Sequence, residues 1–146
     1  MKSAVAALIA MLLVSACSES AGPPVVISEL RIFAPLPGSA SGVAYLTVAN
    51  DSEAAISIID VRSPQFGQIE MHETVIDQNG VSSMNRLQSV EIAAGDSARF
   101  TEGGKHLMLM SAQPDTRAGT PVTLEIELSD GLLIVSATLQ NRLPAE

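Results

Sequence analysis

The chain has 146 residues and a formal net charge of −8, from 8 Lys and Arg against 16 Asp and Glu. Three Phe, one Tyr and no Trp provide no aromatic platform for stacking bases, and the acidic balance provides no phosphate-binding patch. These features argue against nucleic-acid binding. The length suits a single domain with a hydrophobic core of its own.

The N-terminal segment has the composition of an export signal. Lys2 supplies a positive charge, residues 4–14 form an apolar run, and residues 14–16 read Val-Ser-Ala, a small-residue cleavage site. The apolar run is short compared with the roughly 20 residues that a membrane-spanning helix needs. We therefore expect residues 1–16 to be a signal peptide. Its removal takes away Lys2 and no acidic residue, which changes the formal charge to −9.

The expected cleavage site is followed directly by Cys17, the only cysteine in the chain. The sequence LVSAC that ends there resembles the lipobox of bacterial lipoproteins, in which the cysteine becomes the lipidated first residue. The resemblance implies a periplasmic lipoprotein that meets the membrane only through a lipid anchor at Cys17, with residues 17–24 as anchor and tether. The alternative is an ordinary secretory signal with a cysteine nearby by chance. In either case a single cysteine cannot form a disulfide within the chain, so stability must come from the core.

From residue 25 onward, short β-type segments alternate with turn residues, which predicts one domain over residues 25–146. The segments expected to be strands are 25–33, 43–50, 55–62, 68–76, 82–90, 97–100, 105–110, 120–128 and 132–140. Alternation with a period of two residues, in short segments rich in β-branched residues, is typical of an all-β sandwich. Gly95 and Asp96 favour a turn over a helix between residues 89 and 100.

Histidine and methionine are concentrated in one part of the chain. Both histidines and all four methionines that follow the signal lie between residues 71 and 110: Met71, His72, Met84, His106, Met108 and Met110. A single methionine often fills a gap in a core, and a single histidine is usually a hydrogen-bonded polar group. The clustering favours a metal site. For Met71 and Met110 we expect core positions, with a role as spare thioethers as the alternative.

The sequence KHLMLM at residues 105–110 is expected to form a strand with histidine and methionine on one face and leucine on the other. Side chains at positions i and i+2 share one face, so His106 and Met108 point the same way and Leu107 and Leu109 point the other way. The leucines are suited to the core. The opposite face then carries an imidazole, a thioether and, at Met110, a second thioether, which pack poorly but are good soft ligands.

The segments on either side of the sequence DQNG are expected to form a hairpin. If its turn is a three-residue loop with Gly80 in the left-handed conformation, Thr74 faces Met84 and His72 faces Arg86. His72 and Met84 are then diagonal neighbours on one face, about 7–8 Å apart. A two-residue loop would put them on opposite faces, so the prediction depends on the turn.

If this hairpin packs beside the KHLMLM strand, two imidazoles and two thioethers come together. Imidazole and thioether suit Cu(I), whereas structural zinc sites prefer thiolate and Ca²⁺ or Mg²⁺ prefer oxygen. All four candidate ligands are neutral, so the site keeps less positive charge with Cu(I) than with Cu(II), which favours the reduced ion. Thioethers also cannot be lost to disulfide formation in an oxidising compartment.

The stretches MHETVIDQNGVSSMNRL and GGKHLMLM resemble the PCu(A)C family of periplasmic copper chaperones, whose signature is a spaced His, Met and His-x-Met. Between His72 and Met84 this chain has residues 73–83, one more than the signature, and the additional residue falls at the DQNG turn. The spacing from Met84 to His106 agrees with the signature. The resemblance extends to GVAYLTVAN and PVTLEIEL and so covers nearly all of the expected domain.

The resemblance implies a cupredoxin-like Greek-key β-sandwich or barrel that holds Cu(I) through His72, Met84, His106 and Met108. It also implies a metallochaperone, not an enzyme, that passes Cu(I) by ligand exchange. The acceptor would be the CuA centre of cytochrome oxidase or a Sco-type thiol protein.

Other functions fit parts of the same sequence. One alternative is a lipoprotein β-domain with a protein-binding or structural role, and another is copper storage or tolerance. A blue-copper redox protein needs a cysteine ligand, which is missing after Cys17. Hydrolase motifs such as G-x-S-x-G and H-E-x-x-H are also missing from the sequence.

Overall fold

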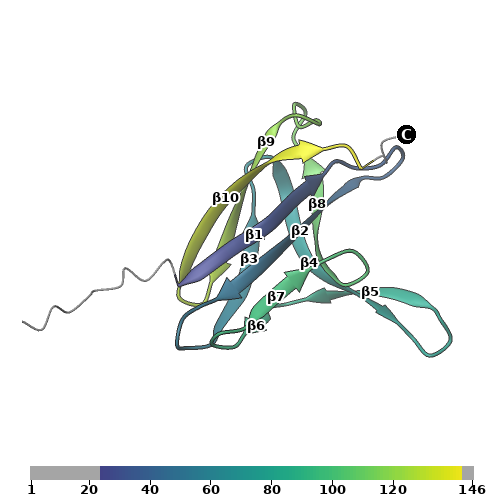
Figure 1. The fold of residues 1–146 in the computed structure, drawn as a ribbon. Helices are drawn as coiled ribbons and strands as arrows, with labels where there is room; N and C mark the ends of the chain where they lie inside the picture. Colours follow the sequence, from purple (N-terminus) through teal and green to yellow (C-terminus); the bar gives the residue numbers. More distant parts are fainter. Residues whose placement is uncertain (1–23, 143–146) are drawn as a thin grey trace, which may run out of the picture.

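The computed structural model describes residues 24–142, and all regular elements in that range are β-strands (Figure 1). The ten strands are β1 (Val25–Phe33), β2 (Ser41–Asn50), β3 (Ile56–Arg62), β4 (Phe66–Ile76), β5 (Ser82–Leu87), β6 (Val90–Ile92), β7 (Ser97–Phe100), β8 (Lys105–Ala112), β9 (Pro121–Leu128) and β10 (Gly131–Gln140). The predicted all-β class is confirmed. The expected signal peptide and Cys17 lie outside the described residues. Between residues 24 and 142 we find no helix with the length and apolarity that a membrane crossing requires.

The strands form one curled sheet in the order β5-β4-β8-β7-β2-β1-β10-β9-β3-β6, with a further pairing between β8 and β2. The first and last strands, β1 and β10, pair in parallel, whereas most other pairs are antiparallel. β3 contacts β4 and β6 contacts β7, although each pair comes from opposite halves of that order. The sheet therefore closes on itself around a common interior, as a sandwich or barrel does.

The interior is built from the alternating apolar residues that the sequence pattern predicted. On β9, Val122, Leu124 and Ile126 are buried, and on β8 Leu107 and Leu109 are buried with them in one core. Fully burying a side chain of this size contributes about 1.5–3 kcal/mol. The opposite face of β8 is thereby left for polar and sulfur-containing side chains.

One predicted strand is wrong. Residues 82–90 do not form a single strand, because β5 ends at Leu87 and the chain then crosses to the other end of the strand order, where β6 pairs with β3. Val90 and Ile92 are buried in the core, whereas almost all of β5 is exposed. For Val90 and Ile92 to be buried, the chain must change direction between β5 and β6, and it does so at residues 88–89.

The buried side chain of Asn50 links the end of β2 to the chain around the end of β6 by hydrogen bonds. Its Nδ2 donates hydrogen bonds to the carbonyls of Ala54, Ile92 and Ala93, at 2.8, 3.1 and 3.1 Å. The end of β2 is thus joined to the loops after β2 and β6, which compensates for the burial of a polar side chain.

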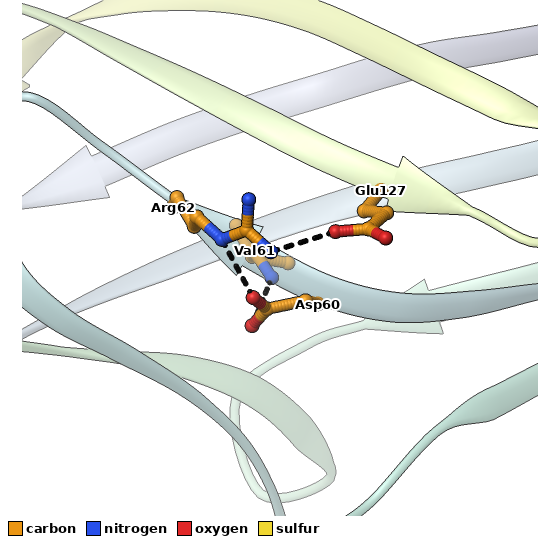
Figure 2. A network of polar contacts seen from close by, with 4 residues as sticks. All are labelled: Asp60, Val61, Arg62 and Glu127. Carbon is orange, nitrogen blue, oxygen red and sulfur yellow. Dashed lines mark hydrogen bonds and ion pairs between the residues drawn. The ribbon is translucent and has the colours of Figure 1, made fainter.

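β3 carries a bulge where its pairing with β9 shifts between Ile58 and Asp60. Figure 2 shows the polar contacts that follow it: Asp60 accepts the backbone N–H of Val61, while Arg62 pairs with Asp60 and Glu127, each at 2.8 Å. The Arg62 side chain is 65% exposed, so water screens both pairs and they contribute little to stability.

Candidate metal centre

β8 presents His106 and Met108 on the face opposite its core leucines, as predicted. His106 is 9% exposed and Met108 is partly buried. β8 pairs with β4 on one side and with β2 on the other, and Met108 lies opposite Val43 of β2 and Glu70 of β4. The His-x-Met sequence therefore lies on a strand that is paired on both sides, where its neighbours fix its position.

β4 brings His72 directly opposite His106. The two residues are register partners, and their ring centroids are 6.0 Å apart with the ring planes tilted by 40°. Met71, the preceding residue, points into the core as expected. The pairing of β4 with β8 thus places two imidazoles side by side on one face.

The β4–β5 hairpin has the predicted turn and register. The N–H of Asp77 donates to the carbonyl of Val81 at 3.0 Å, and Gly80 has a φ of +79°, as a three-residue loop requires. Thr74 lies opposite Met84, and His72 opposite Arg86. The hairpin extends beyond the body of the sheet (Figure 1), and the Met84 side chain is 57% exposed.

A cavity of about 260 Å³ lies where these strands meet. Three of the four predicted ligands, Met84, His106 and Met108, line it, but His72 does not. The imidazole of His72 lies next to His106 instead, on the side toward Glu70.

The rim of the cavity is polar. Arg142 donates to Glu102 at 3.2 Å and to the hydroxyl of Tyr45 at 3.4 Å, and all three residues line the cavity. Desolvation by burial raises the pKa of the Tyr45 hydroxyl, so this group stays protonated at neutral pH.

Hydrogen bonds determine which nitrogen of each imidazole is free. The Nδ1 of His106 is 3.0 Å from the carbonyl oxygen of Gly104, which also accepts the N–H of Thr74. Because a carbonyl oxygen only accepts, this Nδ1 carries the proton, and the Nε2 of a neutral ring has the lone pair. By the same argument the Nε2 of His72, 2.8 Å from Glu70, carries the proton.

The Nδ1 of His72 is therefore a hydrogen-bond acceptor, and it is buried without a partner. In the described part of the chain, no other buried side-chain nitrogen or oxygen lacks one. Buried polar atoms without partners are uncommon and often mark functional positions. An unpaired imidazole nitrogen is a donor atom of the kind that a soft metal ion can use.

Glu70 was not among the residues singled out from the sequence. It accepts hydrogen bonds from His72 and from Gln68, the latter at 2.7 Å, and forms an ion pair with Arg86 at 3.1 Å. The hydrogen bond with His72 is the main cause that holds the pKa of Glu70 below its usual range, followed by desolvation, which opposes it, and by the charge of Arg86. The position of Glu70 two residues before His72 is a signal that strand periodicity could have used.

Met110 does not follow the expectation of a core position. It is partly buried on the same face of β8 as Met108, opposite Ser41 and Gln68, and lies outside the hydrophobic core. The alternation of β8 explains this, because the core face is already taken by the leucines. Met110 also does not line the cavity.

The described residues do not offer a metal site of another kind. Between residues 24 and 142, no three His, Cys, Asp or Glu side chains gather closely enough to hold an ion. A metal ion in this region would therefore depend on the thioethers of Met84 and Met108. This composition fits Cu(I) and not Ca²⁺ or Mg²⁺.

Comparison with known structures identifies the fold. The copper-bound PCuAC domain from PmoF2 superposes with a TM-score of 0.66 at 18% identity, covering 83% of this chain and 96% of that domain. The solution structure of CuI-DR1885 from Deinococcus radiodurans also gives 0.66, at 24% identity, covering 87% of this chain and 85% of that one. The predicted PCu(A)C-type fold is confirmed.

Two relatives match part of the sequence. "Putative lipoprotein Lxx21020" of Leifsonia xyli subsp. xyli is 30% identical over 95 residues, which are 64% of this chain and 57% of that protein. "Uncharacterized protein RP573" of Rickettsia prowazekii is 30% identical over 76 residues, 51% of this chain and 41% of that protein. The chain thus matches about half of the length of these relatives.

A family model described as "Putative lipoprotein LpqE-like" matches residues 25–136, which run from the first strand into the last. This match covers most of the described sheet, including both strands that carry the histidines. The chain belongs to the LpqE-like family.

Proposed function

We propose that this protein is an exported carrier of Cu(I), a metallochaperone and not an enzyme, with His72, Met84, His106 and Met108 as ligands. The observation that carries the proposal is the meeting of two adjacent imidazoles, each with one free nitrogen, and two thioethers that share a cavity with one of them. The copper-bound forms of the PCuAC domain from PmoF2 and of DR1885 support copper as the cargo.

The chemistry of these side chains favours the reduced ion. Two imidazoles and two thioethers add no charge, and the soft sulfur atoms prefer Cu(I) to harder ions. The proposed ligand set contains no thiolate, which structural zinc sites prefer.

Transfer to a partner would proceed by ligand exchange. Met84 is largely exposed on a hairpin that extends from the sheet, so its sulfur is the ligand that an incoming protein could replace. The bond from copper to Met84 breaks as a bond to the partner's thiolate or thioether forms, and copper stays Cu(I) throughout. His106, being nearly buried, would release the ion last.

The cellular setting is part of the same proposal. Residues 1–16 direct export, Cys17 carries a lipid, and residues 17–24 tether the domain in the periplasm. The lipoprotein description of the LpqE-like family and of the Leifsonia relative supports this. The acceptor we propose is the CuA subunit of cytochrome oxidase or a Sco-type thiol protein.

A competition titration tests the proposal. The mature chain, with Cys17→Ser to remove the anchor, would be titrated with Cu(I) under reducing conditions against a chromophoric Cu(I) chelator. We expect one tight equivalent in the wild type and its loss in a folded His106→Ala, Met108→Leu variant. Met110→Leu is the matched control, because Met110 shares the strand and face of Met108 but does not line the cavity.

A second candidate function is protein binding without metal. The hairpin exposes several apolar side chains beside Met84, namely Val75, Ile76 and Val81, which is typical of a contact surface. Failure of the wild type to compete for Cu(I) would favour this function. Tight binding without release to any acceptor would instead indicate copper storage or tolerance.

A further inference from the structure

We propose that Glu70 is a positioning residue for His72: its carboxylate holds the His72 imidazole in the Nε2–H tautomer, so that Nδ1 is the atom offered to Cu(I). The proposal rests on the proposed function, since it specifies how one ligand of that site is prepared. It concerns a residue outside the four predicted ligands.

The contact between Glu70 and His72 is close and sheltered. The Oε2 of Glu70 lies 2.8 Å from the Nε2 of His72, and both side chains are 14% exposed. The two residues are separated by one position on β4, so their side chains leave the strand on the same face. An ionised carboxylate has only lone pairs to offer, so the shared proton belongs to the imidazole.

Glu70 is itself held in place by two further side chains. Its Oε1 accepts a hydrogen bond from Gln68 at 2.7 Å and forms an ion pair with Arg86 at 3.1 Å, which leaves Oε2 for His72. Arg86 comes from β5, where it is the register partner of His72. The carboxylate is thus fixed from its own strand and from the neighbouring one.

The ion pair with Arg86 also matters for charge. An isolated carboxylate beside a metal site would attract the more highly charged Cu(II). Because the guanidinium of Arg86 offsets the charge of Glu70, the pair orients His72 while adding little net charge near the thioethers. The preference of the neutral ligands for Cu(I) is preserved.

The other nitrogen of His72 is left without any protein partner. Its Nδ1 is buried and unpaired, on a ring whose centroid is 6.0 Å from that of His106. In His106 the arrangement is reversed, since Nδ1 donates to Gly104 and Nε2 is free. The geometry therefore assigns opposite nitrogens to the two histidines, Nδ1 of His72 and Nε2 of His106. Metal-binding histidines commonly use one nitrogen for the metal and the other for such an outer partner.

Long-range ¹H–¹⁵N NMR of the imidazoles tests the assignment directly, on the mature chain with Cys17→Ser. In the copper-free protein we expect His72 to carry its proton on Nε2. On loading with Cu(I), which is diamagnetic, the ¹⁵N resonance of Nδ1 should shift while Nε2 stays protonated. The tautomer of His72 in the copper-free protein can be measured whether or not the protein binds copper, so this part of the test is independent of the proposed function.

Three variants separate orientation from general stability. In Glu70→Leu the tautomer preference should be lost and the Cu(I) affinity should fall about 10–100-fold, as for other outer partners of metal ligands. Glu70→Gln should give an intermediate tautomer preference and an intermediate Cu(I) affinity. The amide oxygen of Gln still accepts a hydrogen bond from Nε2–H, but the amide group can also flip and present its NH₂. Glu73→Gln is the matched control: Glu73 is on the opposite face, paired with Lys105 at 2.9 Å, and its loss should change neither measurement.

The outcomes are distinct for the two proposals. An Nδ1–H tautomer in the wild type, a tautomer unaffected by Glu70→Leu in a protein with a native amide spectrum, or a Cu(I) shift at Nε2 would overturn the role of Glu70. Tight Cu(I) binding that the Glu70 variants leave unchanged would overturn it as well. If the wild type binds no Cu(I), the proposed function fails, and with it the ligand role of Nδ1, whatever the tautomer.

Discussion

The candidate ligands differ in how firmly the protein holds them. His106 is nearly buried in the middle of the sheet, and its Nδ1 is fixed by the carbonyl of Gly104. Met84 lies on an extending hairpin and is mostly exposed. In the proposed function, retention and release of the ion therefore fall to different residues.

The Met84→Leu variant tests this division at the level of one residue. Because Met84 is exposed, the free energy of unfolding of the copper-free protein should change by no more than about 0.5 kcal/mol. The Cu(I) affinity should fall on the order of tenfold or more, about 1.4 kcal/mol, and copper should be released faster. Competition titration and thermal unfolding measure the two quantities. Unchanged affinity would remove Met84 from the ligand set.

At the level of elements, the site depends on the register of the β4–β5 hairpin. The three-residue loop ending in Gly80 aligns Thr74 with Met84, which puts the sulfur on the same face as His72. A loop one residue shorter would reverse that face. The turn is therefore as important for the site as the ligands are.

Gly80→Ala should weaken the hairpin. Gly80 has a φ of +79°, and a Cβ there would meet no atom within 4 Å, so the penalty is backbone strain alone. We expect the free energy of unfolding to fall by about 1–2 kcal/mol, with weaker Cu(I) binding. Thermal unfolding and competition titration are the measurements. Gly131→Ala, at a position that is equally open but lacks a positive φ, is the control and should be close to neutral.

Asp77 should make the same turn sensitive to acid. The backbone N–H groups of Val81 and Asn79 donate to its Oδ1 at 2.9 and 2.8 Å and hold its pKa below the usual value. A lowered folded-state pKa stabilises the protein above the unfolded-state pKa, and this stabilisation disappears as the pH falls through the folded-state pKa. Unfolding measured against pH should therefore show Asp77→Ala less stable than wild type at neutral pH, with the difference vanishing in acid. A difference that grows in acid would contradict this account.

Part of this architecture could be predicted from the sequence, because it depends on local pattern. Alternation separated His106 and Met108 from Leu107 and Leu109, and the position of Gly80 predicted the hairpin register. These features depend on neighbours within a few residues.

The rest depends on contacts between distant segments. The break between β5 and β6 arises because Val90 and Ile92 enter the core beside β3. The contact of Glu70 with Arg86 needs the β4–β5 pairing, and the free Nδ1 of His72 is recognisable only once its neighbours are known. Four candidate ligands could thus be named from the sequence, but the contacts around them depend on these pairings between distant segments.

At the level of the whole molecule, the residues that stabilise the fold and the candidate site lie on different faces of the curled sheet. The described core is apolar and has no cross-links, while the candidate site occupies an outer face at one end of the strand order, on β5, β4 and β8. Binding and release can therefore involve the β4–β5 hairpin without opening the core.

The proposed anchor is tested by Cys17→Ser in the full chain. Lipidation needs the thiol, so the wild type should fractionate with membranes, and the variant should appear as a soluble exported protein. Cell fractionation with detection of the protein measures this, and the Cu(I) affinity of both forms should be the same. Recovery of the wild type in the soluble fraction would instead indicate an ordinary secretory signal.

X-ray absorption at the copper K-edge of the Cu(I)-loaded protein tests the central claim most directly, because it reports the oxidation state and the donor atoms together. The account predicts an edge typical of Cu(I) and a first shell that contains both nitrogen and sulfur, with the sulfur contribution reduced in Met108→Leu. A shell of nitrogen and oxygen alone, or an edge typical of Cu(II) under reducing conditions, would contradict it.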